Sequence, residues 1–124
     1  MPTTITTATE KISQAYTLMN ELAKAAGDPL MPMQQLAILA ALAVRGEVSQ
    51  ADLEGITNVA GKTSNSRNVL KLGKGNAALG PGLGLIEQVE DLMDLRAKRI
   101  RLTPQGRKVV EMAMRATYPQ DTKD

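Results

Sequence analysis

The sequence predicts a mainly α-helical domain with a small β-hairpin, in the order helix, helix, helix, helix, strand, strand, helix. Three observations predict this α+β class. The 124-residue chain has no Phe, no Trp and only two Tyr, so aliphatic residues and Met must build the core. Apolar residues recur at helical spacing near the start, whereas they alternate with polar residues at 99–103. At this length we expect one domain, residues 1–124.

The first helix is predicted over residues 5–26, before the Gly27–Pro29 stop. Its apolar positions step by three and four residues, which is the rhythm of a helix packed along another helix. The partner can be the rest of the same domain or a second copy of the chain. The candidate dimer seam consists of Ile5, Ile12, Met19 and Leu22.

The next three helices follow from local signals. Pro32 suits a first helical turn, and the stretch "MQQLAILAALAVRG" after it is apolar on nearly all sides, so this helix should be central to the core. Ser49 and Asp52 have the spacing of a capping box and open a short helix through Ile56. A fourth helix is predicted from about Thr63.

Residues 73–83 are rich in glycine, which raises the question of a phosphate-binding loop. No strand precedes these glycines, no helix opens directly after them, and neither GxGxxG nor GxxxxGK[ST] is present. We therefore predict a flexible connector.

The last part of the chain reads as a hairpin followed by a helix. Residues 85–103 are predicted to form two strands joined by a turn, with Ile100 and Leu102 on one face. Thr103 is placed to cap a final helix, 104–118, whose first position is Pro104. Two short helices with a tight turn, followed by a hairpin, make residues 30–103 a winged helix-turn-helix.

The net charge of +2 conceals strong clustering. Residues 55–86 carry four bases and no acid, and residues 95–108 carry six bases, which favours a polyanionic partner. Between these blocks, residues 87–94 hold four acids. Those acids either lie away from the polyanion, or pair across the hairpin as Glu87 or Glu90 with Arg99 or Arg101.

Several function classes are excluded by composition. With no Cys and no His, the chain has no disulfide, thiolate site, structural zinc or Ser-His triad. The acids lack the spacing of a calcium loop, and no second acidic cluster completes a catalytic pocket. We predict no enzyme, no metal and no cofactor. The chain shows no signal-peptide pattern and no apolar stretch of membrane length, so a cytoplasmic location without membrane contact is expected.

The stretch "GLIEQVEDLMDLRAKRIRLTPQG", residues 84–106, resembles the wing of the MarR family of winged-helix transcriptional regulators. The family's elements match without a gap at Gly84-Leu85-Ile86, Asp94-Leu95-Arg96, Leu102-Thr103 and Gly106. "PMQQLAIL" and "SQADLEGI" resemble its second and third helices, so the likeness spans about residues 30–108. The wing tip departs from the family pattern because it carries the apolar residues Leu92, Met93 and Leu95.

The resemblance implies a homodimeric, sequence-specific regulator of transcription that binds double-stranded DNA. Its recognition helix would enter the major groove and its wing the minor groove. Arg96 would reach the minor groove, braced by Asp94. The DNA-binding residues would be Lys62, Thr63, Ser64, Asn65, Arg67, Asn68, Lys71 and Lys74 on the helix, and Arg96, Lys98, Arg99 and Arg101 on the wing.

Two alternatives stay open. The short polar residues that open the fourth helix can cap it, and its lysines can simply form a solvated face. The apolar wing tip also suits a second function, namely a protein-interaction module that docks on the transcription machinery.

Overall fold

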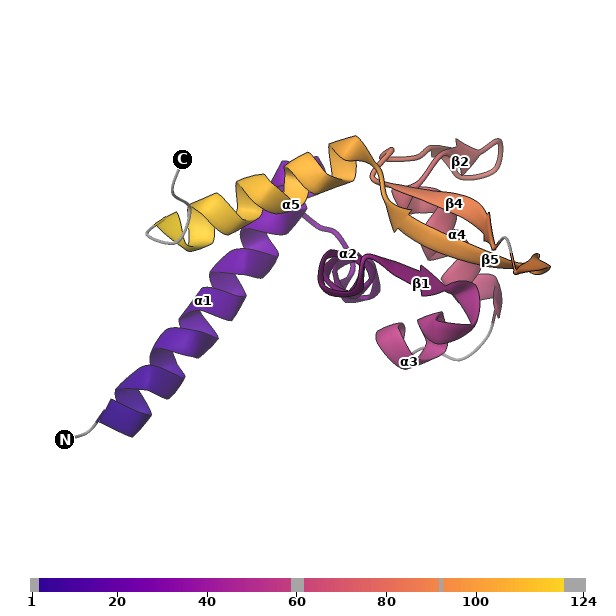
Figure 1. Cartoon of the computed structure of the whole chain (residues 1–124). Coiled ribbons are helices and arrows are strands. Elements are labelled where there is room, and N and C mark those ends of the chain that lie inside the picture. Colours follow the sequence, from indigo (N-terminus) through magenta and orange to yellow (C-terminus); the bar gives the residue numbers. More distant parts are fainter. Residues whose placement is uncertain (1–2, 59–61, 92, 120–124) are drawn as a thin grey trace.

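The computed structural model describes residues 3–58, 62–91 and 93–119 (Figure 1). Within these residues the chain forms five α-helices, a short 3-10 helix and five strands. The helices are α1 (Thr3–Ala25), α2 (Met33–Arg45), α3 (Leu53–Thr57), α4 (Lys62–Leu72) and α5 (Pro104–Thr117). The strands are β1 (Glu47–Ser49), β2 (Gly75–Asn76), β3 (Gly80–Pro81), β4 (Ile86–Asp91) and β5 (Asp94–Leu102). The predicted helices and the hairpin are confirmed.

The main sheet has three antiparallel strands in the order β1-β5-β4. Its central strand, β5, pairs with β4 in the wing hairpin and with β1 on its other side. The predicted order lacked β1. This strand is only three residues long, and its partner lies about fifty residues further along the chain, Glu47 facing Arg101.

The core is centred on α2, as its all-round apolar sequence predicted. Ile38, Leu39 and Leu42 are completely or almost completely buried. They form one cluster with Leu72 of α4 and Ile100 of β5. Full burial of each such side chain contributes roughly 1.5–3 kcal/mol. Helix α2 is therefore the element against which α4 and the sheet both pack.

Local capping sets the boundaries of several helices. Ser49 and Asp52 form the predicted capping box, with the Ser49 amide donating to Asp52 Oδ2 at 3.2 Å. Thr103 caps α5 as predicted, because its Oγ1 accepts a hydrogen bond from the Gly106 amide at 3.0 Å.

Helix α1 has two different halves (Figure 1). Its C-terminal half contacts α5 and the core, where Leu22, Ala23 and Ala26 are buried. Leu22 is therefore a core residue and not part of an open seam, which corrects the prediction for that position. Residues 7–16 are exposed, and Figure 1 shows this end pointing away from the body. Among the described helices, none is long and apolar enough to cross a membrane.

The glycine-rich segment, which we predicted to be a flexible connector, contains a short hairpin. Its strands β2 and β3 pair antiparallel, and the Leu79 amide donates to Asn76 Oδ1 at 2.8 Å within the turn. The glycines allow this because backbone packs directly on backbone. A Cβ on Gly82 would overlap the Gly73 carbonyl oxygen and would lie 2.6 Å from the Gly75 nitrogen. The segment also returns to α4, where the Leu83 amide donates to the Lys71 carbonyl.

We expect Gly82→Ala to lower the free energy of unfolding by about 1–3 kcal/mol. The added methyl group would overlap backbone atoms, which cannot move aside as a flexible side chain can. Gly55→Ala is the matched control. An added Cβ there meets nothing within 4 Å, so the substitution should be neutral or raise stability by up to about 1 kcal/mol. Urea denaturation measures both. Equal stability of Gly82→Ala and wild type would contradict the packing of this hairpin.

Candidate nucleic-acid interface

Helix α4 has an inner and an outer face. Asn65, Val69 and Leu72 are buried on the inner face. The outer face carries Ser64, Arg67 and Lys71, at intervals of three and four residues along the helix. Lys74 follows three residues later, just after α4 ends at Leu72. Ser64, Arg67 and Lys74 are exposed and Lys71 is half-buried. No acidic residue occurs in α4. We call these four residues the outer stripe; it is a continuous polar and cationic surface.

Two asparagines predicted to contact bases do not lie on this stripe. Asn65 is only 4% exposed, and its Oδ1 lies 2.9 Å from Thr57 Oγ1 of α3. Its side chain therefore faces the protein interior, which corrects the prediction of a base contact. Asn68 is half-buried, and its Oδ1 accepts a hydrogen bond from Gln35 Nε2 of α2 at 3.2 Å. Asn68 therefore lies at the edge of the outer stripe.

Some predicted residues can be placed only by their backbone. Lys62 and Thr63 occupy the first two positions of α4, and Asp94 and Arg96 lie at the start of β5 beside the wing tip. Their side chains lie outside the described residues, as does that of Ile5 in α1. The predicted bracing of Arg96 by Asp94 therefore stays a prediction.

The two faces of the main sheet carry different chemistry. Side chains alternate along a strand, and directly paired residues share a face. Ile100 is buried against the core, so Lys98 and its partner Glu90 lie on that same core-side face, nearer the tip. A groove there is lined by Lys98 of β5, by Glu87 and Glu90 of β4, and by Lys74, which follows α4. Lys98 thus lies on the same side of the sheet as α4.

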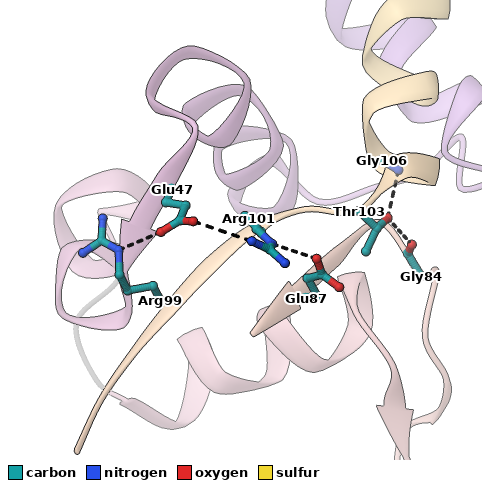
Figure 2. Close-up of polar contacts among 7 residues, drawn as sticks. All are labelled: Glu47, Gly84, Glu87, Arg99, Arg101, Thr103 and Gly106. Atoms are coloured by element: carbon teal, nitrogen blue, oxygen red, sulfur yellow. Dashed lines mark hydrogen bonds and ion pairs between the residues drawn. The ribbon is translucent and has the colours of Figure 1, made fainter. Parts of the chain in front are cut away.

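The opposite face of the sheet holds an alternating ion-pair network (Figure 2). Arg99 Nε donates to Glu47 Oε1 at 3.0 Å, and Arg101 Nη1 lies 3.9 Å from Glu47 Oε2. Arg101 Nε donates to Glu87 Oε2 at 2.8 Å. The hydrogen bond and the charge of Glu87 raise the pKa of Arg101 above its already high ordinary value, so this guanidinium stays charged at every physiological pH.

The network explains the abrupt change of sign in the wing sequence. Antiparallel pairing brings the acidic strand β4 beside the basic strand β5, with Glu87 opposite Arg101 and Glu90 opposite Lys98. The cross-strand alternative is confirmed for Glu87 and Arg101. Arg99 instead pairs with Glu47, a residue that the sequence did not single out. Arg99 and Arg101 lie on the face away from α4, and their placement does not support the DNA contact predicted for them.

The remaining motif residues form the junction between the wing and α5 (Figure 2). Thr103 Oγ1 donates to the Gly84 carbonyl at 2.7 Å, and the Thr103 amide donates to the Leu85 carbonyl at 2.9 Å. A Cβ on Gly106 would collide with that same carbonyl of Leu85. The motif residues Gly84, Thr103 and Gly106 therefore hold the base of the wing against the start of α5.

The wing tip is exposed. Met93 follows β4 at the hairpin turn and is 94% exposed. Leu92 lies outside the described residues, and so does the side chain of Leu95. The one apolar tip residue whose side chain is described thus projects into solvent.

No protein-family model matches the chain, and no curated protein matches it. Several solved structures do match the chain. A mutant of MarR from Escherichia coli, complexed with operator DNA, is 14% identical with a TM-score of 0.61, over 97% of this chain and 76% of that one. RV1404 from Mycobacterium tuberculosis is 19% identical with a TM-score of 0.68, over 95% and 73%. YusO from Bacillus subtilis is 18% identical with a TM-score of 0.61, over 96% and 77%. At such identities the likeness shows a shared fold.

Proposed function

We propose that this chain, which has the winged-helix fold of the MarR-family transcriptional regulators, is a sequence-specific double-stranded DNA-binding regulator and not an enzyme. The observation that carries the proposal is the outer stripe of α4. The stripe is acid-free and continuous, and it lies on α4 and its C-terminal end, the helix that comes after α3 in chain order. A helix of this kind suits the major groove, and its cations suit the phosphates on either side.

Within this proposal the stripe has two parts. Ser64 lies in the N-terminal half of α4, the half that normally meets base edges, and its hydroxyl can donate or accept. Thr63 and Lys62 precede it in the helix, and Asn68 lies at the edge of the surface. Lys71 and Lys74 lie further along, where contacts to phosphate set affinity and register rather than sequence preference.

The wing extends the same surface. We propose that Arg96, at the start of β5 beside the tip, enters the minor groove and that Asp94 braces it. Lys98 shares the sheet side of α4 and can neutralise a phosphate near the groove that it lines with Lys74. Arg99 and Arg101 are not included, because their ion pairs lie on the other side of the sheet.

We propose further that the regulator is a homodimer joined through α1 and α5. The N-terminal half of α1 exposes apolar side chains that a globular protomer would normally cover, with Ile12 71% exposed. Tyr16, Met112 and Met114 are further large exposed apolar residues on these two helices. A two-fold dimer would read a pseudo-palindromic operator with half-sites about 10 bp apart.

A second candidate function is favoured by Met93. A nearly fully exposed apolar side chain at a hairpin tip suits a protein partner, and acids beside it in the sequence, Asp91 and Asp94, are unfavourable next to phosphate. In that case the tip docks on the transcription machinery.

Salt dependence tests DNA binding by the outer stripe. The logarithm of the binding constant should fall linearly with the logarithm of salt concentration, and Lys71→Gln should flatten the slope by about 1, for one lost phosphate contact. Arg101→Gln removes the same charge from the far side of the sheet and should leave the slope unchanged. Fluorescence anisotropy of a labelled duplex at several salt concentrations measures both. Equal slope changes for the two variants would contradict the proposed surface.

The dimer is tested by Ile12→Asp, which places a charge in the middle of the proposed seam. We expect light scattering to report the mass of one chain, 13.3 kDa, instead of two. Gln14→Asp is the control, because Gln14 is also exposed but lies about 200° further round the helix. A monomeric wild type, or a dimer that survives Ile12→Asp, would rule out this interface.

For the second candidate, purified RNA polymerase is tested for capture by the immobilised chain. Met93→Gln should abolish capture because it removes the apolar contact, and should leave duplex affinity within about twofold of wild type because it adds no charge. Capture that is absent in wild type, or is unaffected by Met93→Gln, would remove the candidate.

A further inference from the structure

We infer that Gln35 of α2 and Thr57 of α3 are positioning residues that fix the rotation of α4, so that its outer stripe faces outward. The inference rests on the proposed DNA-binding function and deepens it. Neither residue reaches the surface on which DNA would lie; each acts through an asparagine of the recognition helix.

The apolar face of α4 is too sparse to set its orientation alone. Among the described side chains of this helix, Val69 and Leu72 are the buried apolar ones, and both lie in its C-terminal half. Contact between apolar side chains has no strong directional preference, so two such contacts permit rotation about the helix axis. In the N-terminal half, which would meet base edges, the buried residue among the described side chains is the polar Asn65.

Gln35 supplies one directional contact. It is 6% exposed, and its Nε2 donates to Asn68 Oδ1 at 3.2 Å. Its own Oε1 is buried and has no hydrogen-bond partner among the described residues. An amide oxygen in that state disfavours folding, and an apolar side chain of similar length would avoid the cost. Burial of Gln35 is therefore better explained by the direction that its amide gives to α4 than by stability.

Thr57 supplies the second directional contact, from a different helix. It is 8% exposed, and its Oγ1 lies 2.9 Å from both the Leu53 carbonyl and Asn65 Oδ1. A hydroxyl has one proton, so it serves these two acceptors one at a time. The contact joins the backbone of α3 to the buried side chain of Asn65 across the turn of the helix-turn-helix.

Together the two contacts hold successive turns of α4. Asn65 and Asn68 are three residues apart, so α3 holds the first turn and α2 the next. Hydrogen bonds weaken steeply when they bend, which makes rotation of the helix costly in either direction. With Asn65 and Asn68 held inward, Ser64, Arg67 and Lys71 must face outward. The same contacts explain why these asparagines are poor candidates for reading bases.

The test compares Gln35→Met and Thr57→Val with wild type, and Thr57→Ser with Thr57→Val. Met keeps the length of Gln and Val keeps the shape of Thr, whereas Ser keeps the hydroxyl. The probe is a duplex selected by wild type from a random library, and its scrambled sequence is the reference. We expect the affinity ratio of selected to scrambled duplex to fall about fivefold in Gln35→Met and in Thr57→Val, at unchanged salt slope, with Thr57→Ser close to wild type.

Two further measurements keep the outcomes separate. Amide hydrogen exchange in α4 should quicken in both variants without DNA, while the thermal midpoint of Gln35→Met stays at or above that of wild type. A wild type that does not distinguish the two duplexes would overturn the proposed function and this inference together. If wild type distinguishes the two duplexes, and the folded variants show the same affinity ratio and the same exchange rates as wild type, only the positioning role would be overturned.

Discussion

The direction in which α4 faces is the constraint on which the function of this molecule depends. A helix with polar residues on most of its circumference can present several different surfaces. Here Val69 and Leu72 are buried on one side, and the contacts from α2 and α3 hold Asn65 and Asn68 on that same side and so set the orientation. Arg67, Lys71 and Lys74 then share the opposite side, and the wing hairpin lies beside them. A rotation of α4 about its own axis by one residue position, about 100°, would turn that surface away from its outward direction.

Clustered charge in a sequence does not by itself define a binding surface. Residues 95–108 carry six bases, yet two of them, Arg99 and Arg101, are engaged by Glu47 and Glu87 on the far side of the sheet. Glu87 and Glu90 of β4 lie opposite Arg101 and Lys98 of β5 because the strands run antiparallel. The hairpin is thus close to electrically balanced along its length, and the net cationic surface comes from α4 and from Lys74 just after it. Exposed ion pairs of this kind add little to stability. Their effect is that the paired arginines are neutralised by acids, so that only the unpaired cations are left to bind an anionic ligand.

Features that depend on neighbours in sequence could be predicted, and features that depend on distant partners could not. The capping box of Ser49 and Asp52 and the cap at Thr103 are local, and both were predicted correctly. Strand β1 was missed because three residues carry no periodicity and its partner is distant. Burial of Asn65 and Gln35 was missed for the same reason, since a polar residue is buried only where the fold brings it a partner. The wing motif correctly indicated the fold because Gly84, Thr103 and Gly106 build the junction that defines it.

Lysine footprinting tests the central claim most directly, because it asks which face of the intact protein a duplex covers. Acetylation of each lysine is compared by mass spectrometry with and without bound duplex. The outer stripe predicts strong protection of Lys71 and Lys74, with Lys98 protected beside them, and unchanged reactivity of Lys11 and Lys24 on α1. Protection that is spread evenly over all lysines, or confined to α1, would contradict the proposal that α4 presents the DNA-binding surface.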